Sequence, residues 1–204
     1  MIAEFHGYYS GMAKLRGRWD NEPQPVAWLE QFMATKQRVY LVLDTSRFPT
    51  DLSADENGLS EAVFDWLPSN SPVKAPRLFE LASWPNWREA VEEVWGSDAM
   101  MVLSCSQAKD QLVSHLRKLV RGSGREGEAP HSVRGICWPA VLGSLLDIEA
   151  TGFANEYFTV VDSVWTEAAD EPNAWQWVGK PEVLRSVCQS MGIRLRDMSK
   201  ASTK

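Results

Sequence analysis

The most regular hydrophobic pattern in the chain lies between residues 99 and 146. It opens with an unbroken apolar run, residues 99–103, which has the length of a β-strand covered on both faces. From 108 to 120, apolar residues recur at the spacing of one stripe of an α-helix. A second extended segment, 132–138, leads to a short helix over 139–146. The pattern therefore predicts strand, helix, strand and helix in this stretch.

Shorter patterns on either side predict the remaining elements. The first 24 residues have little periodicity, so we expect them to be irregular. Helices are expected at 25–35, 60–66, 86–95 and 181–191, and strands at 38–43, 77–81, 157–165 and 175–178. This alternation favours an α/β or mixed α+β fold with a central sheet of about four to five strands flanked by helices.

The same pattern suggests three parts along the chain. Residues 1–37 would form an irregular segment and a helix, 38–180 the α/β domain, and 181–204 a small C-terminal helical appendage with a basic tail. A chain of 204 residues, 44% of them hydrophobic, has room for one well-formed core. No apolar run approaches the roughly 18 residues of a membrane span, and the N-terminus lacks the apolar block of a signal peptide. We therefore expect a cytoplasmic protein without membrane insertion.

Charge alternates along the chain, whose formal net charge is -6. Residues 38–108 hold 5 basic and 11 acidic side chains, and 135–179 hold 7 acidic and no basic ones. Between them, 109–134 hold 6 basic against 3 acidic side chains. A nucleic-acid-binding protein more often carries a net basic surface, so this distribution favours protein partners over nucleic acid.

Two literal motif matches fail in context. The glycines at 122, 124 and 127 satisfy G-x-G-x-x-G, but a helix is expected before them and a strand after them, which reverses the order of a dinucleotide site. Residues 53–58 look like the front of a calcium loop, yet Phe64 stands where a bidentate glutamate is needed. The glycine loop is therefore read as a connection, and calcium binding is not expected.

Histidine and cysteine give no sign of a metal site or an active site. The three histidines, His6, His115 and His131, lack ligand spacing. The three cysteines, Cys105, Cys137 and Cys188, are widely spaced in apolar surroundings, as expected of small buried side chains. The sequence therefore predicts no catalytic residue, no metal, no cofactor and no small-molecule substrate.

Tryptophan is unusually frequent, with ten residues in the chain. Three of them, Trp28, Trp87 and Trp95, lie on apolar helix faces and are expected in the core. Four others lie next to turns or acidic residues: Trp84, Trp165, Trp175 and Trp177. Because aromatic rings are enriched at the centres of protein interfaces, we interpret these four as exposed anchors for a partner, surrounded by unpaired carboxylates.

Several blocks of sequence occur in an order that resembles a known family. They are residues 40–44, 75–81, Trp87 with Trp95-Gly96, 101–106, 115–119 and 132–142, and the resemblance covers roughly 38–146. The order resembles the bacterial type VI secretion adaptor, or effector chaperone, family. That resemblance implies a non-catalytic cytoplasmic adaptor, with a toxic effector and the secreted spike protein as its partners.

One block departs from the family pattern. Where the family usually has Tyr-Asp-Pro or a similar triplet, this chain has Cys137-Trp138-Pro139 and so lacks that carboxylate. The alternative interpretation is an immunity-type or other protein-binding module whose acidic surface neutralises a basic toxin. The residues predicted to contact a partner are Trp84, His115, Arg117, Arg134, Trp165, Asp170, Glu171, Trp175 and Trp177. For His115 and Arg117, on the polar side of the central helix, bracing of a loop and a simple solvated helix face are the other open interpretations.

Overall fold

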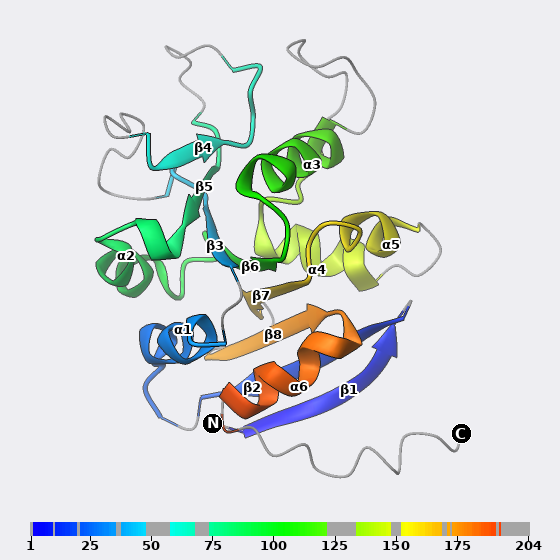
Figure 1. Cartoon of the computed structure of the whole chain (residues 1–204). Coiled ribbons are helices and arrows are strands. Elements are labelled where there is room, and N and C mark those ends of the chain that lie inside the picture. The colour runs from blue at the N-terminus through cyan, green and yellow to red at the C-terminus, as the bar shows by residue number, and fades with distance from the viewer. Residues whose placement is uncertain are drawn as a thin grey trace.

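The structure is a computed structural model in which one extended sheet runs through the molecule (Figure 1). It describes residues 2–9, 11–19, 21–35, 38–47, 58–67, 74–121, 134–147, 152–168, 171, 173–190 and 192. All structural statements below concern these ranges.

The described strands form a single eight-stranded sheet in the order β1-β2-β8-β7-β6-β3-β5-β4. Every pairing between neighbouring strands is antiparallel. The prediction of a mixed α+β fold is confirmed, but that of about four to five strands is wrong. The strands are β1 (Ile2–Tyr9), β2 (Met12–Arg18), β3 (Arg38–Leu43), β4 (Ser60–Ala62), β5 (Arg77–Glu80), β6 (Met100–Cys105), β7 (Ser163–Glu167) and β8 (Ala174–Gly179).

The centre of the sheet is formed by the two most apolar strands, as their sequences predict. All six residues of β6 are buried, and β3 is buried after its first residue, Arg38. The two strands pair directly, with Tyr40 opposite Leu103 and Val42 opposite Met101. Such continuous apolar runs require cover on both faces of the sheet.

Helices supply that cover in two layers (Figure 1). One core contains buried residues of α1, α2 and α6, and the other contains those of α3, α4 and α5. No helix in the described ranges is long and apolar enough to cross a membrane. The helices are α1 (Pro25–Met33), the 3-10 helix η1 (Leu81–Ser83), α2 (Trp87–Val94), α3 (Lys109–Arg121), α4 (Pro139–Asp147), α5 (Phe153–Tyr157) and α6 (Pro181–Ser190).

The N-terminal residues form a hairpin, so the expectation of an irregular segment is wrong. Strands β1 and β2 pair across a turn at Gly11, whose φ angle of 80° lies in the left-handed region. In β2, buried Ala13, Leu15 and Gly17 alternate with more accessible basic residues. Helix α6 packs into the same core as this hairpin, so it is part of the sheet's cover rather than an appendage.

Three further sequence-based assignments need correction. Residues 60–62 form strand β4, where a helix was expected, because they pair with β5. The described end of the expected strand 132–138 contains a turn at 136–137. The expected strand 157–165 is divided, since α5 ends at Tyr157 and β7 begins at Ser163.

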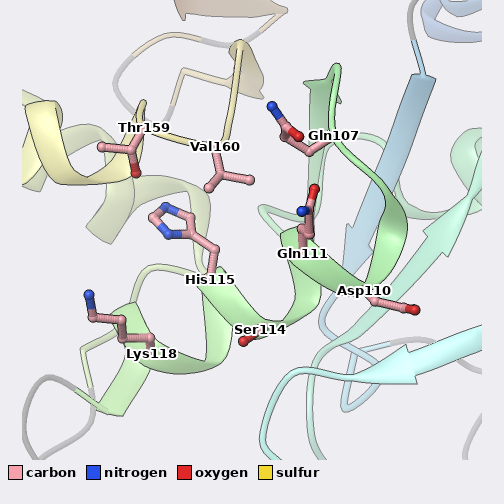
Figure 2. Close-up of a pocket in the computed structure, with 8 residues that line it drawn as sticks. All are labelled: Gln107, Asp110, Gln111, Ser114, His115, Lys118, Thr159 and Val160. Atoms are coloured by element: carbon pink, nitrogen blue, oxygen red, sulfur yellow. The ribbon is translucent and has the colours of Figure 1, made fainter.

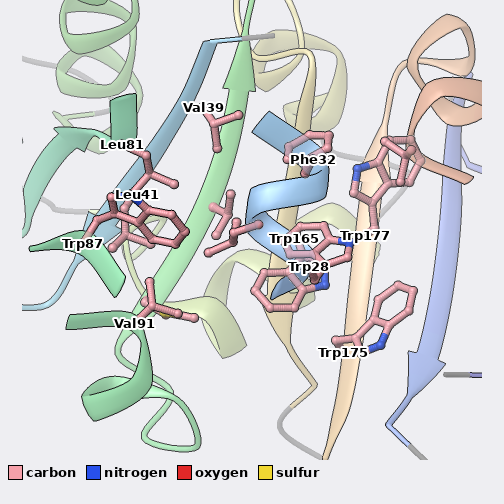
Figure 3. Close-up of a cluster of buried hydrophobic side chains, with 14 of the residues drawn as sticks. Trp28, Phe32, Val39, Leu41, Leu81, Trp87, Val91, Trp165, Trp175 and Trp177 are labelled. Carbon is pink, nitrogen blue, oxygen red and sulfur yellow. The ribbon is translucent and has the colours of Figure 1, made fainter. Parts of the chain in front are cut away.

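The tryptophans interpreted as exposed anchors lie in the core, which corrects that prediction. Trp165, Trp175 and Trp177 are each at most 1% exposed, and Trp84 is 7% exposed and stacked on Phe79. Figure 3 shows Trp28 and Trp165 close together, and their ring centroids are 4.1 Å apart. The physical reason is that β7 and β8 have a strand on each side and helices over their faces.

Candidate functional site

A groove of about 490 Å³ runs along α3 on the side that faces residues 158–162. One wall consists of six residues: Gln107, Asp110, Gln111, Ser114, His115 and Lys118. Thr159 and Val160 form the other wall, as Figure 2 shows. Because it holds His115, which the sequence singles out, we treat this groove as the candidate site.

The amphipathic sequence of α3 determines which of its residues reach the groove. Leu112, Leu116 and Leu119 are buried against the sheet, so the polar residues between them face outward. Asp110 lies in the first turn and Lys118 in the last turn. Each charge therefore has the sign that the helix dipole favours at its own end.

His115 connects the groove to α5. Its Nε2 lies 3.0 Å from the carbonyl oxygen of Tyr157. A carbonyl only accepts hydrogen bonds, so Nε2 carries the proton and Nδ1 of the neutral ring is an acceptor. Burial lowers the pKa of His115, and this effect exceeds the opposing effects of the Tyr157 carbonyl and Glu156. The ring is therefore neutral at pH 7.

Arg117 points to the opposite side of α3 and does not line the groove. Its Nε and Nη2 donate to the carbonyl oxygen of Ala62 at 3.2 and 2.8 Å, and Nη2 lies 3.6 Å from Glu61. One turn further on, Arg121 forms an ion pair with Asp65. Arg117 thus links β4 to α3. This is a bracing role, one of the roles left open for it in the sequence analysis.

Arg134 does not line the groove. Its backbone N–H donates to the carbonyl oxygen of Val120 at 2.8 Å, which ties it to the end of α3. Its guanidinium lies 3.7 Å from Glu156 of α5, and both side chains are more than 40% exposed. Solvent screens such a pair, so it contributes little to stability.

The predicted acidic surface near β8 is partly neutralised. Glu171 lies 3.5 Å from Arg16 and 3.2 Å from Arg18, so the expectation of an unpaired carboxylate is wrong there. Strand β2 lies beside β8 and brings these arginines, which are far away in sequence, next to the turn. Asp170 lies outside the described residues.

A second polar junction lies where β3 meets the start of α4. Asp44 is buried, and its Oδ1 accepts hydrogen bonds from the N–H and hydroxyl of Ser46. Its Oδ2 accepts one from the indole Nε1 of Trp138 at 3.1 Å and lies 3.6 Å from Arg47. Because the carboxylate is buried and fully engaged, this junction supports the fold rather than presenting a surface.

Only part of the groove could be found from the sequence. Of the predicted partner-binding residues that the structure describes, His115 alone lines it. Gln111, Ser114 and Lys118 were missed, although their helical spacing around His115 was a usable signal. Thr159 was missed because its segment was expected to be a strand.

The groove can donate and accept hydrogen bonds and carries one charge of each sign. In the described part of the chain, no three His, Cys, Asp or Glu side chains gather closely enough to hold a metal. Comparisons with protein-family models, with curated proteins and with solved structures return no match.

Proposed function

We propose that this protein is a non-catalytic adaptor of bacterial type VI secretion, which binds an effector in the cytoplasm and helps to load it onto the spike protein. The proposal rests on the resemblance of sequence blocks within residues 38–146. The observation that carries it is that these blocks meet in space. Strands β5, β3 and β6 are neighbours in the sheet, and α3 covers one of their faces.

The Asp44–Trp138 hydrogen bond adds to this support. It joins the block that closes β3 to the block in which Cys137-Trp138-Pro139 replaces the family's usual triplet. A contact between blocks so far apart in sequence is expected if they belong to one structural unit. The loss of the family's acidic residue is therefore compatible with the same architecture.

Three polar residues of the blocks, Ser104, His115 and Arg117, have internal partners, which fits a scaffold better than a catalytic centre. Ser104 of β6 is buried and its hydroxyl lies 2.7 Å from that of Ser163 on β7. His115 contacts the Tyr157 carbonyl, and Arg117 contacts the Ala62 carbonyl. We therefore expect alanine at Ser104 or His115 to impair folding or partner binding rather than to abolish a turnover.

Co-purification with the products of the neighbouring genes tests the proposal. The tagged protein is co-expressed with the spike protein and the effector encoded beside it, and we expect the effector to be retained through gel filtration. An effector from an unrelated secretion cluster is the specificity control. If neither the effector nor the spike protein is retained, the adaptor function is contradicted.

The acidic face of α2 favours one alternative. Glu89, Glu92 and Glu93 are exposed and form no ion pair with a described residue. Such a surface could neutralise a basic toxin, as an immunity-type protein does. Protection of toxin-expressing cells by this protein, abolished by the triple Glu→Gln variant, would support that alternative over the adaptor.

A further inference from the structure

We propose that the groove along α3 binds an extended segment of the partner polypeptide, in which a basic and an acidic side chain are about four residues apart. This inference rests on the proposed adaptor function and specifies the surface through which it acts. It follows from the charges at the two ends of the groove, the polar groups between them and the spacing of the helix.

Four side chains of the groove have no side-chain partner among the described residues. Asp110, Gln111, Ser114 and Lys118 are exposed and form no hydrogen bond or ion pair with another described residue. Their neighbour Arg117 on the same helix is used internally, as described above. The polar surface of α3 is thus divided into a side that braces the fold and a side that remains available to a partner.

The two charges fix the spacing of the occupant. Asp110 and Lys118 lie at opposite ends of the drawn part of α3 in Figure 2. Lys118 follows Asp110 by eight positions, which is about 12 Å at the rise of an α-helix. An extended chain covers that distance in about four residues, and positions i and i+4 of such a chain point to the same side. A base opposite Asp110 and an acid opposite Lys118 can therefore face the groove together.

The middle of the groove suits the main chain of an extended peptide. Gln111 offers a carboxamide that both donates and accepts, and Ser114 offers a hydroxyl. His115 offers its Nδ1 as an acceptor, since Nε2 is occupied by the Tyr157 carbonyl. A helical occupant already satisfies its own backbone groups, and a simple anion would pair with Lys118 but leave Asp110 without a partner. These groups therefore favour an extended, mixed-charge segment.

Selection from a phage library of random 12-residue peptides tests this without knowledge of the partner. We expect the wild-type protein to enrich sequences with a base and an acid four positions apart. Ser114→Trp places a bulky ring at an exposed residue that lines the groove and should abolish the enrichment, with circular dichroism verifying the fold. Absence of any enrichment that depends on Ser114 overturns the inference.

A charge-reversal experiment is the second part of the test. The best selected peptide, synthesised, should bind Lys118→Glu at least 10-fold more weakly than wild type, and replacement of its acid by lysine should restore binding to that variant. Lys109→Glu is the matched control, since Lys109 lies on the same helix but does not line the groove. Equal binding by wild type and Lys118→Glu contradicts the proposed pairing.

The result separates this inference from the adaptor proposal. If the neighbouring effector co-purifies but no peptide depends on the groove, the groove inference falls and the adaptor function stands. If peptides bind as expected but neither effector nor spike protein is retained, the adaptor function falls and the peptide-binding groove stands.

Discussion

The indole Nε1 of Trp138 donates a hydrogen bond to Oδ2 of Asp44 across 3.1 Å, joining positions 94 residues apart in sequence. Asp44 is 5% exposed, so its carboxylate depends on protein partners in place of water. The contact connects the end of β3 to the start of α4, two elements that are far apart in the sequence. It is therefore a long-range constraint on the fold.

Removal of this bond should be measurable as a loss of stability. We expect Trp138→Phe to lower the free energy of unfolding by about 1–3 kcal/mol, because one oxygen of a buried carboxylate loses its donor. A double-mutant cycle with Asp44→Asn, followed by urea denaturation, isolates the coupling between the two side chains. Strictly additive effects of the two substitutions would show that the bond makes no net contribution.

Arg117 should matter for stability and not for the groove. We expect Arg117→Met to reduce the free energy of unfolding by about 1–3 kcal/mol, since the Ala62 carbonyl loses a charged donor. Glu61→Gln is the matched control, with an expected effect below about 1 kcal/mol because Glu61 is 43% exposed. A selective loss of peptide binding in a stably folded Arg117→Met variant would place Arg117 in the binding surface instead.

Stability should fall with acidification through His115. Its folded pKa lies below the unfolded value of about 6.5, so the unfolded chain binds more protons as the pH drops through 6.5. Stability from this group is therefore fully present above about pH 7 and declines toward pH 5. Denaturation at both pH values, compared with His115→Gln, measures the difference, and NMR titration measures the pKa. An imidazole that titrates above 6.5 contradicts the effect of burial.

The close approach of Gly17 to Trp175 gives a prediction about packing. The two residues are opposite each other in the β2–β8 register, and a Cβ on Gly17 would overlap with the ring of Trp175. We expect Gly17→Ala to destabilise the protein by about 1–3 kcal/mol through overpacking. Thermal unfolding and near-ultraviolet circular dichroism detect the displaced ring. Ala13→Gly, at a neighbouring buried position of β2, controls for a general weakening of the strand.

The elements predicted best from the sequence are those with a strong local pattern. Strands β3 and β6 are continuous apolar runs, and α3 has a clear apolar stripe, so each pattern fits few other secondary structures. Strand β2 also alternates, but Ala13 and Gly17 on its buried face are too small to make the alternation conspicuous. Its hairpin was consequently missed.

The exposure of the tryptophans depends on contacts that local sequence does not contain. Proximity to a turn suggested that Trp175 and Trp177 were accessible, but β2 lies beside their strand and their rings are buried in a core shared with α1 and α6. The groove, too, could be predicted only in part from local sequence. Residues of α3 could be assigned to one helical face, whereas Thr159 and Val160 join them only because α5 ends at Tyr157.

Secretion of the neighbouring effector tests the adaptor function most directly. In a strain that lacks this gene, we expect the effector to disappear from the culture medium while secretion of the apparatus's own tube protein continues. Complementation with wild type or Lys109→Glu should restore effector secretion, and complementation with Lys118→Glu should not. Undiminished effector secretion in the deletion strain would contradict the account.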